Sequence, residues 1–201
     1  MKNAHVGMTG TLIGTLLKGT LLFGLSLGLA LGVLLTPVRA QAADDKDKGA
    51  SASVSAADKN FIMEASSGGM AVVALGELAQ QKGQSDAVKQ FGKRMVEDHG
   101  KANNELAALA TRKGVVVPAA LKPKYQKVVD ALSKLSGAAF DKQYLHEMVK
   151  DHENDVAAFQ KESTHGKDTE LMAWAKQTLP TLQDHLKMAR DAETQVTHGP
   201  K

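Results

Sequence analysis

Histidines are the residues of this chain whose types and spacing could do chemistry. The phrase Met-Val-x-Asp-His occurs twice, at residues 95–99 and 148–152, and a third Asp-His pair ends at His185. Three imidazoles can bind a divalent transition-metal ion, with water or a carboxylate completing its coordination shell. The pattern predicts a metal site formed by His99, His152 and His185.

Residues close to these histidines could support such a site. The aspartate before each histidine points about 100° away around its helix, towards a neighbouring helix. There it can accept an N–H from another helix's histidine or bind the ion directly. Two methionines precede histidines by one helical turn, and thioether sulfur suits copper, although methionine also fills gaps in cores. The expected ion is copper or zinc, and the supporting residues are Asp98, Asp151, Asp184, Met95 and Met148.

Four long segments place apolar residues at intervals of three and four, which is typical of one face of a helix. We expect helices from an Asp58 cap to residue 82, from a Ser85 cap to residue 113, from residue 138 to 165, and from an Asp168 cap to residue 196. A shorter helix is expected to begin at Pro123. Each histidine lies on the apolar face near the middle of its helix, so all three should lie at similar depth.

The connections between these helices predict the topology. Those between the first and second, and between the third and fourth, are short, so each pair should form an antiparallel hairpin. The middle connection is long and carries the short helix. This is the connectivity of an all-α, ferritin-like four-helix bundle. Glycines 68, 69 and 76 cost about 1 kcal/mol each in the first helix and indicate close packing of another helix there.

The beginning of the chain has the composition of a secretory signal peptide. Lys2 and Lys18 precede an apolar run at 21–35, and small residues allow cleavage after Ala40 or Ala42. Cleavage predicts a periplasmic or otherwise exported protein. An uncleaved leader would instead anchor the protein in the inner membrane. The expected divisions are a leader at 1–42, a flexible linker at 43–57, the bundle at 58–197 and a tail at 198–201.

Charge and composition exclude several functions. The leader carries three basic residues and no acidic ones, which leaves basic and acidic residues equal in number in the remainder. A neutral mature protein lacks the basic surface of a nucleic-acid-binding protein, and cleavage would leave no membrane segment. The absence of cysteine excludes thiolate metal sites. No phosphate-binding loop, nucleophilic serine elbow or zinc-protease motif occurs, and the chain lacks the Glu-x-x-His pairs of di-iron bundles. None of these features identifies or excludes a protein partner.

Residues 61–196 resemble the bacterial exported DUF4142 family, a domain of unknown function with a ferritin-like bundle. The matching motifs are Gly68-Gly69-Met70-Ala71, Leu75-Gly76-Glu77-Leu78-Ala79, Met95-Val96-Glu97-Asp98-His99, Lys113-Gly114-Val115, Phe140-Asp141, Asp151-His152, Thr178-Leu179-Pro180-Thr181-Leu182 and His185. The resemblance implies the fold and no established activity. Family members often carry a glutamate where this chain has Val72, so the first helix lacks a midpoint carboxylate.

Three functional hypotheses follow. The leading one is an exported, non-enzymatic bundle that binds a transition metal through the three histidines, in metal handling or envelope stress. The second is a structural or interaction protein whose histidines are ordinary core residues. The third, a ferritin-like redox enzyme, is the least favoured because the chain offers few midpoint carboxylates.

Overall fold

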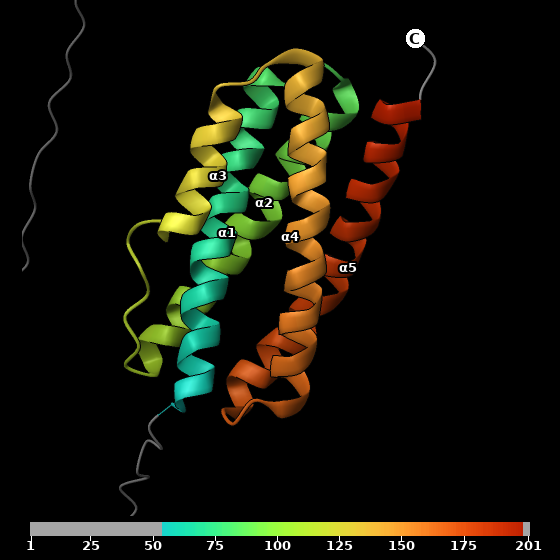
Figure 1. Cartoon of the computed structure of the whole chain (residues 1–201). Coiled ribbons are helices and arrows are strands. Elements are labelled where there is room, and N and C mark those ends of the chain that lie inside the picture. The colour runs from blue at the N-terminus through green and yellow to red at the C-terminus, as the bar shows by residue number, and fades with distance from the viewer. Residues whose placement is uncertain (1–53, 199–201) are drawn as a thin grey trace, which may run out of the picture. The chain divides into compact units, whose positions relative to one another are not determined.

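A computed structural model describes residues 54–198, which form five helices and no strand (Figure 1). The leader, most of the linker at 43–57 and the last three residues of the predicted tail lie outside this range. The all-α prediction is confirmed. The helices are α1 Ala56–Lys82, α2 Asp86–Arg112, α3 Pro123–Ser133, α4 Gly137–His165 and α5 Thr169–His198.

Side-chain caps determine where three of these helices begin. The Ser85 hydroxyl accepts a hydrogen bond from a backbone N–H in the first turn of α2, and Asp168 does the same for α5, so both predicted caps are confirmed. The predicted cap of α1 at Asp58 is wrong by three residues. Ser55 caps this helix instead, with its Oγ 3.1 Å from the Asp58 nitrogen. The helix therefore begins at Ala56.

The long helices form two antiparallel hairpins, α1 with α2 and α4 with α5. In Figure 1, α1 and α5 run in one direction and α2 and α4 in the opposite one. The hairpins meet through contacts of α1 with α4 and of α2 with α5. The connection from α2 to α4 returns along the bundle and contains α3, which packs mainly on α1. These contacts confirm a bundle of two hairpins joined by a long crossover.

Glycines allow close approach of α1 and α2, as predicted from the first helix. A Cβ atom on Gly76 would lie 2.6 Å from the carbonyl oxygen of Gly92. A Cβ atom on Gly92 would lie 2.6 Å from the Cβ of Ala79. The backbones therefore touch at this point, where any side chain would force them apart.

Two aspartates join the hairpins at opposite ends of the bundle. The carboxylate of Asp141, at the start of α4, accepts hydrogen bonds of 2.9 and 2.8 Å from the backbone N–H groups of residues 84 and 85 in the α1–α2 turn. The carboxylate of Asp58, at the start of α1, accepts bonds of 3.1 and 3.0 Å from residues 167 and 168 in the α4–α5 turn. Each turn thus depends on a carboxylate of the other hairpin for its backbone hydrogen bonds.

The apolar core is divided along the bundle. The largest cluster lies towards the α1–α2 turn and includes Phe91, Tyr144 and the two predicted supporting methionines. Two smaller clusters occupy the other half. Along α2, α4 and α5, each histidine falls between these two halves of the core. Among the described helices, α1 alone is long and apolar enough to cross a membrane, a criterion that a core helix also meets.

Candidate metal centre

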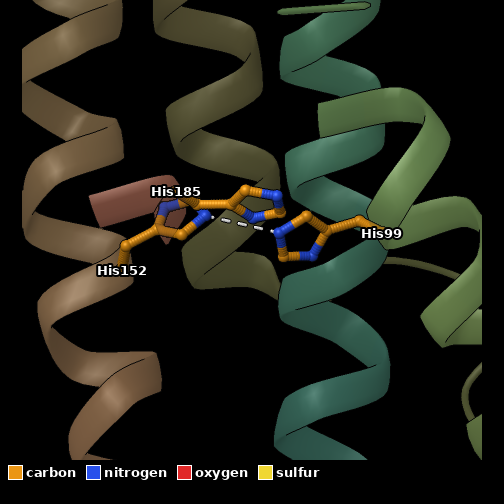
Figure 2. Close-up of side chains that lie close together, drawn as sticks. All are labelled: His99, His152 and His185. Atoms are coloured by element: carbon orange, nitrogen blue, oxygen red, sulfur yellow. Dashed lines mark hydrogen bonds between the residues drawn. The ribbon is translucent and has the colours of Figure 1, made fainter. Parts of the chain in front are cut away.

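The bundle brings the three predicted histidines together from three helices. His99 comes from α2, His152 from α4 and His185 from α5, and their rings point towards one another (Figure 2). The ring centroids are 5.3–5.5 Å apart, and one nitrogen from each ring lies within 4.8 Å of the other two. None of the three histidines is more than 5% exposed. The centre is therefore a compact triangle of imidazoles shielded from solvent.

The closest pair already has the spacing of metal ligands. The Nε2 atoms of His99 and His152 are 3.3 Å apart. Two nitrogens bound about 2.0–2.1 Å from one ion at the tetrahedral angle would be about 3.3–3.4 Å apart. Without an ion, the same spacing corresponds to an N–H···N hydrogen bond, which needs a proton on one of the two Nε2 atoms.

Hydrogen bonds on the outer sides of two rings fix which nitrogen is free. The Nδ1 of His152 lies 2.9 Å from the Met148 carbonyl oxygen. Because a carbonyl oxygen can only accept, Nδ1 carries the proton and Nε2 keeps a free lone pair. The Nε2 of His185 likewise donates to Asp98 Oδ2 at 2.7 Å. Its Nδ1 is then unprotonated, buried and without a partner among residues 54–198. Carbonyl and carboxylate acceptors orient metal-binding histidines in this way.

Burial keeps the three rings neutral near pH 7. The pKa of His99 is well below its ordinary value because desolvation disfavours the charged ring and the other two histidines add repulsion. Burial, with repulsion from His185, lowers the pKa of His152 to about 4 despite its bond to Met148. Burial also lowers the pKa of His185, although Asp98 opposes this. Neutral imidazole is the form that binds metal, so no imidazolium has to lose its charge before an ion binds.

Among the predicted supporting residues, Asp98 makes a side-chain hydrogen bond to a histidine. Burial alone would raise the pKa of its carboxyl, but hydrogen bonds from Arg94 and His185 outweigh this and lower the pKa. The carboxylate is therefore ionised, and it comes from a different helix than the histidine it holds. An ionised acceptor makes the imidazole a stronger donor to a metal.

The other predicted supporting residues lie elsewhere. Asp184 is exposed, and no hydrogen bond in the described part of the chain joins it to a histidine. Asp151 faces a groove between α1, α3 and α4, where its Oδ2 is buried without a hydrogen-bond partner. The Met95 and Met148 side chains pack in the large apolar cluster. Of these three aspartates, Asp98 is the one that hydrogen-bonds a histidine within residues 54–198, whereas Asp151 faces the groove and Asp184 is exposed to solvent.

A small cavity beside the histidines adds two residues that the sequence reasoning missed. It measures about 30 Å³, enough for one water molecule, and is lined by His99, His185, Asp155 and Asn103 among others. Asp155 follows His152 by three residues, and Asn103 follows His99 by four. These intervals place residues on one helical face and could have identified both. The cavity leaves room for a further ligand on a bound ion.

The first helix contributes small side chains to this cavity and no carboxylate. Gly69 lines it, and a Cβ atom there would lie 2.1 Å from Asn103 Oδ1. Val72 is buried instead in the large cluster and faces the groove. The nearby ligand set is thus three imidazoles with Asp98 and Asp155. Di-iron bundles use four carboxylates and two histidines, so this set does not fit that centre.

Comparisons with known proteins agree with the fold. No curated protein matches the chain. The structure is similar to the crystal structure of a DUF305 fragment from Deinococcus radiodurans, with a TM-score of 0.62 and 15% identity, covering 71% of this chain and 98% of that one. At this identity the likeness shows a common fold. The family model described as "Domain of unknown function (DUF4142)" matches residues 43–192, more than half of the 201 residues. The chain therefore belongs to the DUF4142 family.

Proposed function

We propose that the protein binds one transition-metal ion, copper or zinc, through His99, His152 and His185. One observation carries this proposal. Two buried rings each keep an unprotonated nitrogen in the centre, while an outer acceptor holds the opposite nitrogen of each ring. The lone pair on His185 Nδ1 is buried without a donor among the described residues, which costs free energy, and a cation removes that cost. The third ring, His99, lies within ligand distance of both.

The donor set supports zinc or copper rather than a harder cation. Three neutral imidazoles suit both metals, whereas magnesium and calcium prefer oxygen ligands. The 30 Å³ cavity provides a position for water or for the Asp155 carboxylate as the fourth ligand. We therefore propose a single ion held by three histidines, with water or Asp155 in the fourth position.

The cellular role is that of an exported metal-binding protein. The leader inferred at residues 1–42 supports action in the periplasm, in metal handling or in the response to envelope stress. The deeply buried centre favours retention of the ion over rapid exchange with solvent. The function is therefore one of binding and storage or delivery, without a catalysed reaction.

A structural role for the histidines is the second candidate. The 3.3 Å contact between His99 and His152 can be a hydrogen bond, and the rings pack edge to face in the core. In that case the rings contribute to stability alone. The unpaired Nδ1 of His185 argues against this candidate, because a core histidine ordinarily has both nitrogens bonded.

Metal titration of the purified protein distinguishes the two candidates. Copper(II) or zinc is added in competition with a chelator of known affinity, for wild type and for His99→Gln, His152→Gln and His185→Gln. The exposed His146→Gln serves as the matched control. We expect one ion per chain, a loss of at least 100-fold in affinity for each core variant, and no change for the control. Equal affinity in wild type and all core variants contradicts metal binding and leaves the structural role.

A further inference from the structure

A second, larger cavity lies between α1, α3 and α4. It measures about 490 Å³, and the exposed Lys124 and Lys150 line it, so it is reached from solvent. Its α4 side carries three carboxylates, those of Glu147, Asp151 and Asp155. We call this cavity the α3 groove. A cleft lined by carboxylates attracts cations.

The three carboxylates lie in a row along α4. They are four residues apart, so each lies one turn, about 6 Å, beyond the last on the same helical face. In the middle of the row, the Oδ2 atom of Asp151 is buried without a hydrogen-bond partner among the described residues. A buried, unpaired carboxylate oxygen needs a cation or a donor, and the groove provides space for one.

The row ends at the metal centre. Asp155 lines the α3 groove and also the small cavity beside His99 and His185. Asp155 is the residue shared by the linings of the α3 groove and the small cavity. A cation that reaches the Asp155 carboxylate from the groove is therefore already next to the histidine triangle.

We propose that the α3 groove is the entrance through which the metal ion reaches the three histidines, with Asp151 and Asp155 as successive oxygen ligands. This inference rests on the proposed function. Single carboxylates bind zinc and copper more weakly than three converging imidazoles, so the ion moves inward. Negative charge in a cleft raises association rates by about 10- to 1000-fold. Two lysines also line this groove, and burial and the neighbouring Asp151 raise the pKa of the Asp155 carboxyl, so we expect an effect at the lower end of this range.

One of the two lysines that line the groove, Lys124, is already engaged. The Lys124 ammonium lies 2.7 Å from Glu64 Oε2 and 4.5 Å from the centre of the Tyr125 ring. Its charge is thus partly balanced by a neighbour and partly held over an aromatic face. This residual positive charge at the groove slows cation entry, which gives a second, opposite test.

Stopped-flow fluorescence can measure the entrance directly. Trp174 is the single tryptophan of the chain and lines the small cavity, so copper(II) arriving there quenches its emission. We compare wild type with Asp151→Asn and Asp155→Asn at low salt. The matched control is Glu153→Gln, which replaces an exposed carboxylate on the same helix, outside the groove, with its amide.

We expect association about tenfold slower in Asp151→Asn and Asp155→Asn, unchanged in Glu153→Gln, and faster in Lys124→Gln. Circular dichroism verifies that each variant is folded, and the Lys124 variant tests the groove without touching its carboxylates. If both aspartate variants associate at the wild-type rate, or the control slows equally, the entrance is wrong while one-to-one binding and the proposed function stand. If wild type binds no ion, both inferences are overturned.

Discussion

Replacing Asp98 with asparagine would test how far a carboxylate outside the ligand shell sets the metal affinity. Asparagine has the same size, and its Oδ1 can still accept the Nε2–H of His185 that now lies 2.7 Å from Asp98 Oδ2. The change therefore removes the negative charge and keeps the hydrogen bond. It isolates the electrostatic part of the interaction.

The structure sets the size of the effect. Outer partners of metal-binding histidines typically contribute about 10- to 100-fold in affinity, equivalent to about 1.4–2.7 kcal/mol. The Asp98 side chain is 24% exposed, so water screens its charge. We therefore expect a loss near the lower limit, about tenfold. The exposed Arg94 also loses its partner, which costs little because surface ion pairs contribute little.

The assay is zinc competition against a chelator at pH 7.5, with Asp184→Asn as the matched control. Asp184 precedes the same histidine, is exposed and makes no hydrogen bond to the ring, so its replacement changes the net charge equally at a residue that does not contact the ring. We expect wild-type affinity in this control. Equal affinity in Asp98→Asn and wild type would refute the role of the carboxylate. An equal loss in both variants would show that net charge alone is responsible.

Two further predictions concern stability. The pKa of His152 is about 4 in the folded protein against 6.5 in the unfolded chain, so the unfolded chain binds more protons as pH falls through this range. Urea unfolding of metal-free protein should give a free energy about 2 kcal/mol lower at pH 5 than at pH 7.5, and a flat profile would contradict the burial argument. Gly92→Ala should destabilise by about 1–3 kcal/mol because its Cβ would lie 2.6 Å from that of Ala79. Gly100→Ala, with no heavy atom within 4 Å, should stabilise by up to about 1 kcal/mol, and equal thermal shifts in both variants would disprove the close contact.

The sequence was sufficient to predict the fold and the meeting of the histidines, for two physical reasons. Periodicity reports which residues face the core, and His99, His152 and His185 all follow it. A residue at the midpoint of a helix stays level with the midpoints of its neighbours whichever way those helices run. The length of the connection between α2 and α4 then distinguished the crossover topology from a simple up-and-down bundle.

The surroundings of the histidines depend on rotations that periodicity does not report. Asp98 and Asp184 have the same place in their Asp-His pairs, yet one turns towards a neighbouring helix and the other towards water. Only the packing of whole helices decides between them. Asp58 likewise has the chemistry of a cap for its own helix. Its carboxylate instead bonds a turn more than 100 residues later, a contact that local rules cannot detect.

The two aspartates whose carboxylates bond the turns occupy equivalent positions in the two hairpins. Asp58 precedes Gly83, the residue that ends α1, by the same interval as Asp141 precedes Gly166, the residue that ends α4. Superposing the hairpins by this interval makes His152 the counterpart of Gly69, and His99 the counterpart of a leucine, Leu182. The repeated Met-Val-x-Asp-His phrase is thus not a trace of the internal symmetry. The helical scaffold follows this internal symmetry, whereas the positions of the histidines do not.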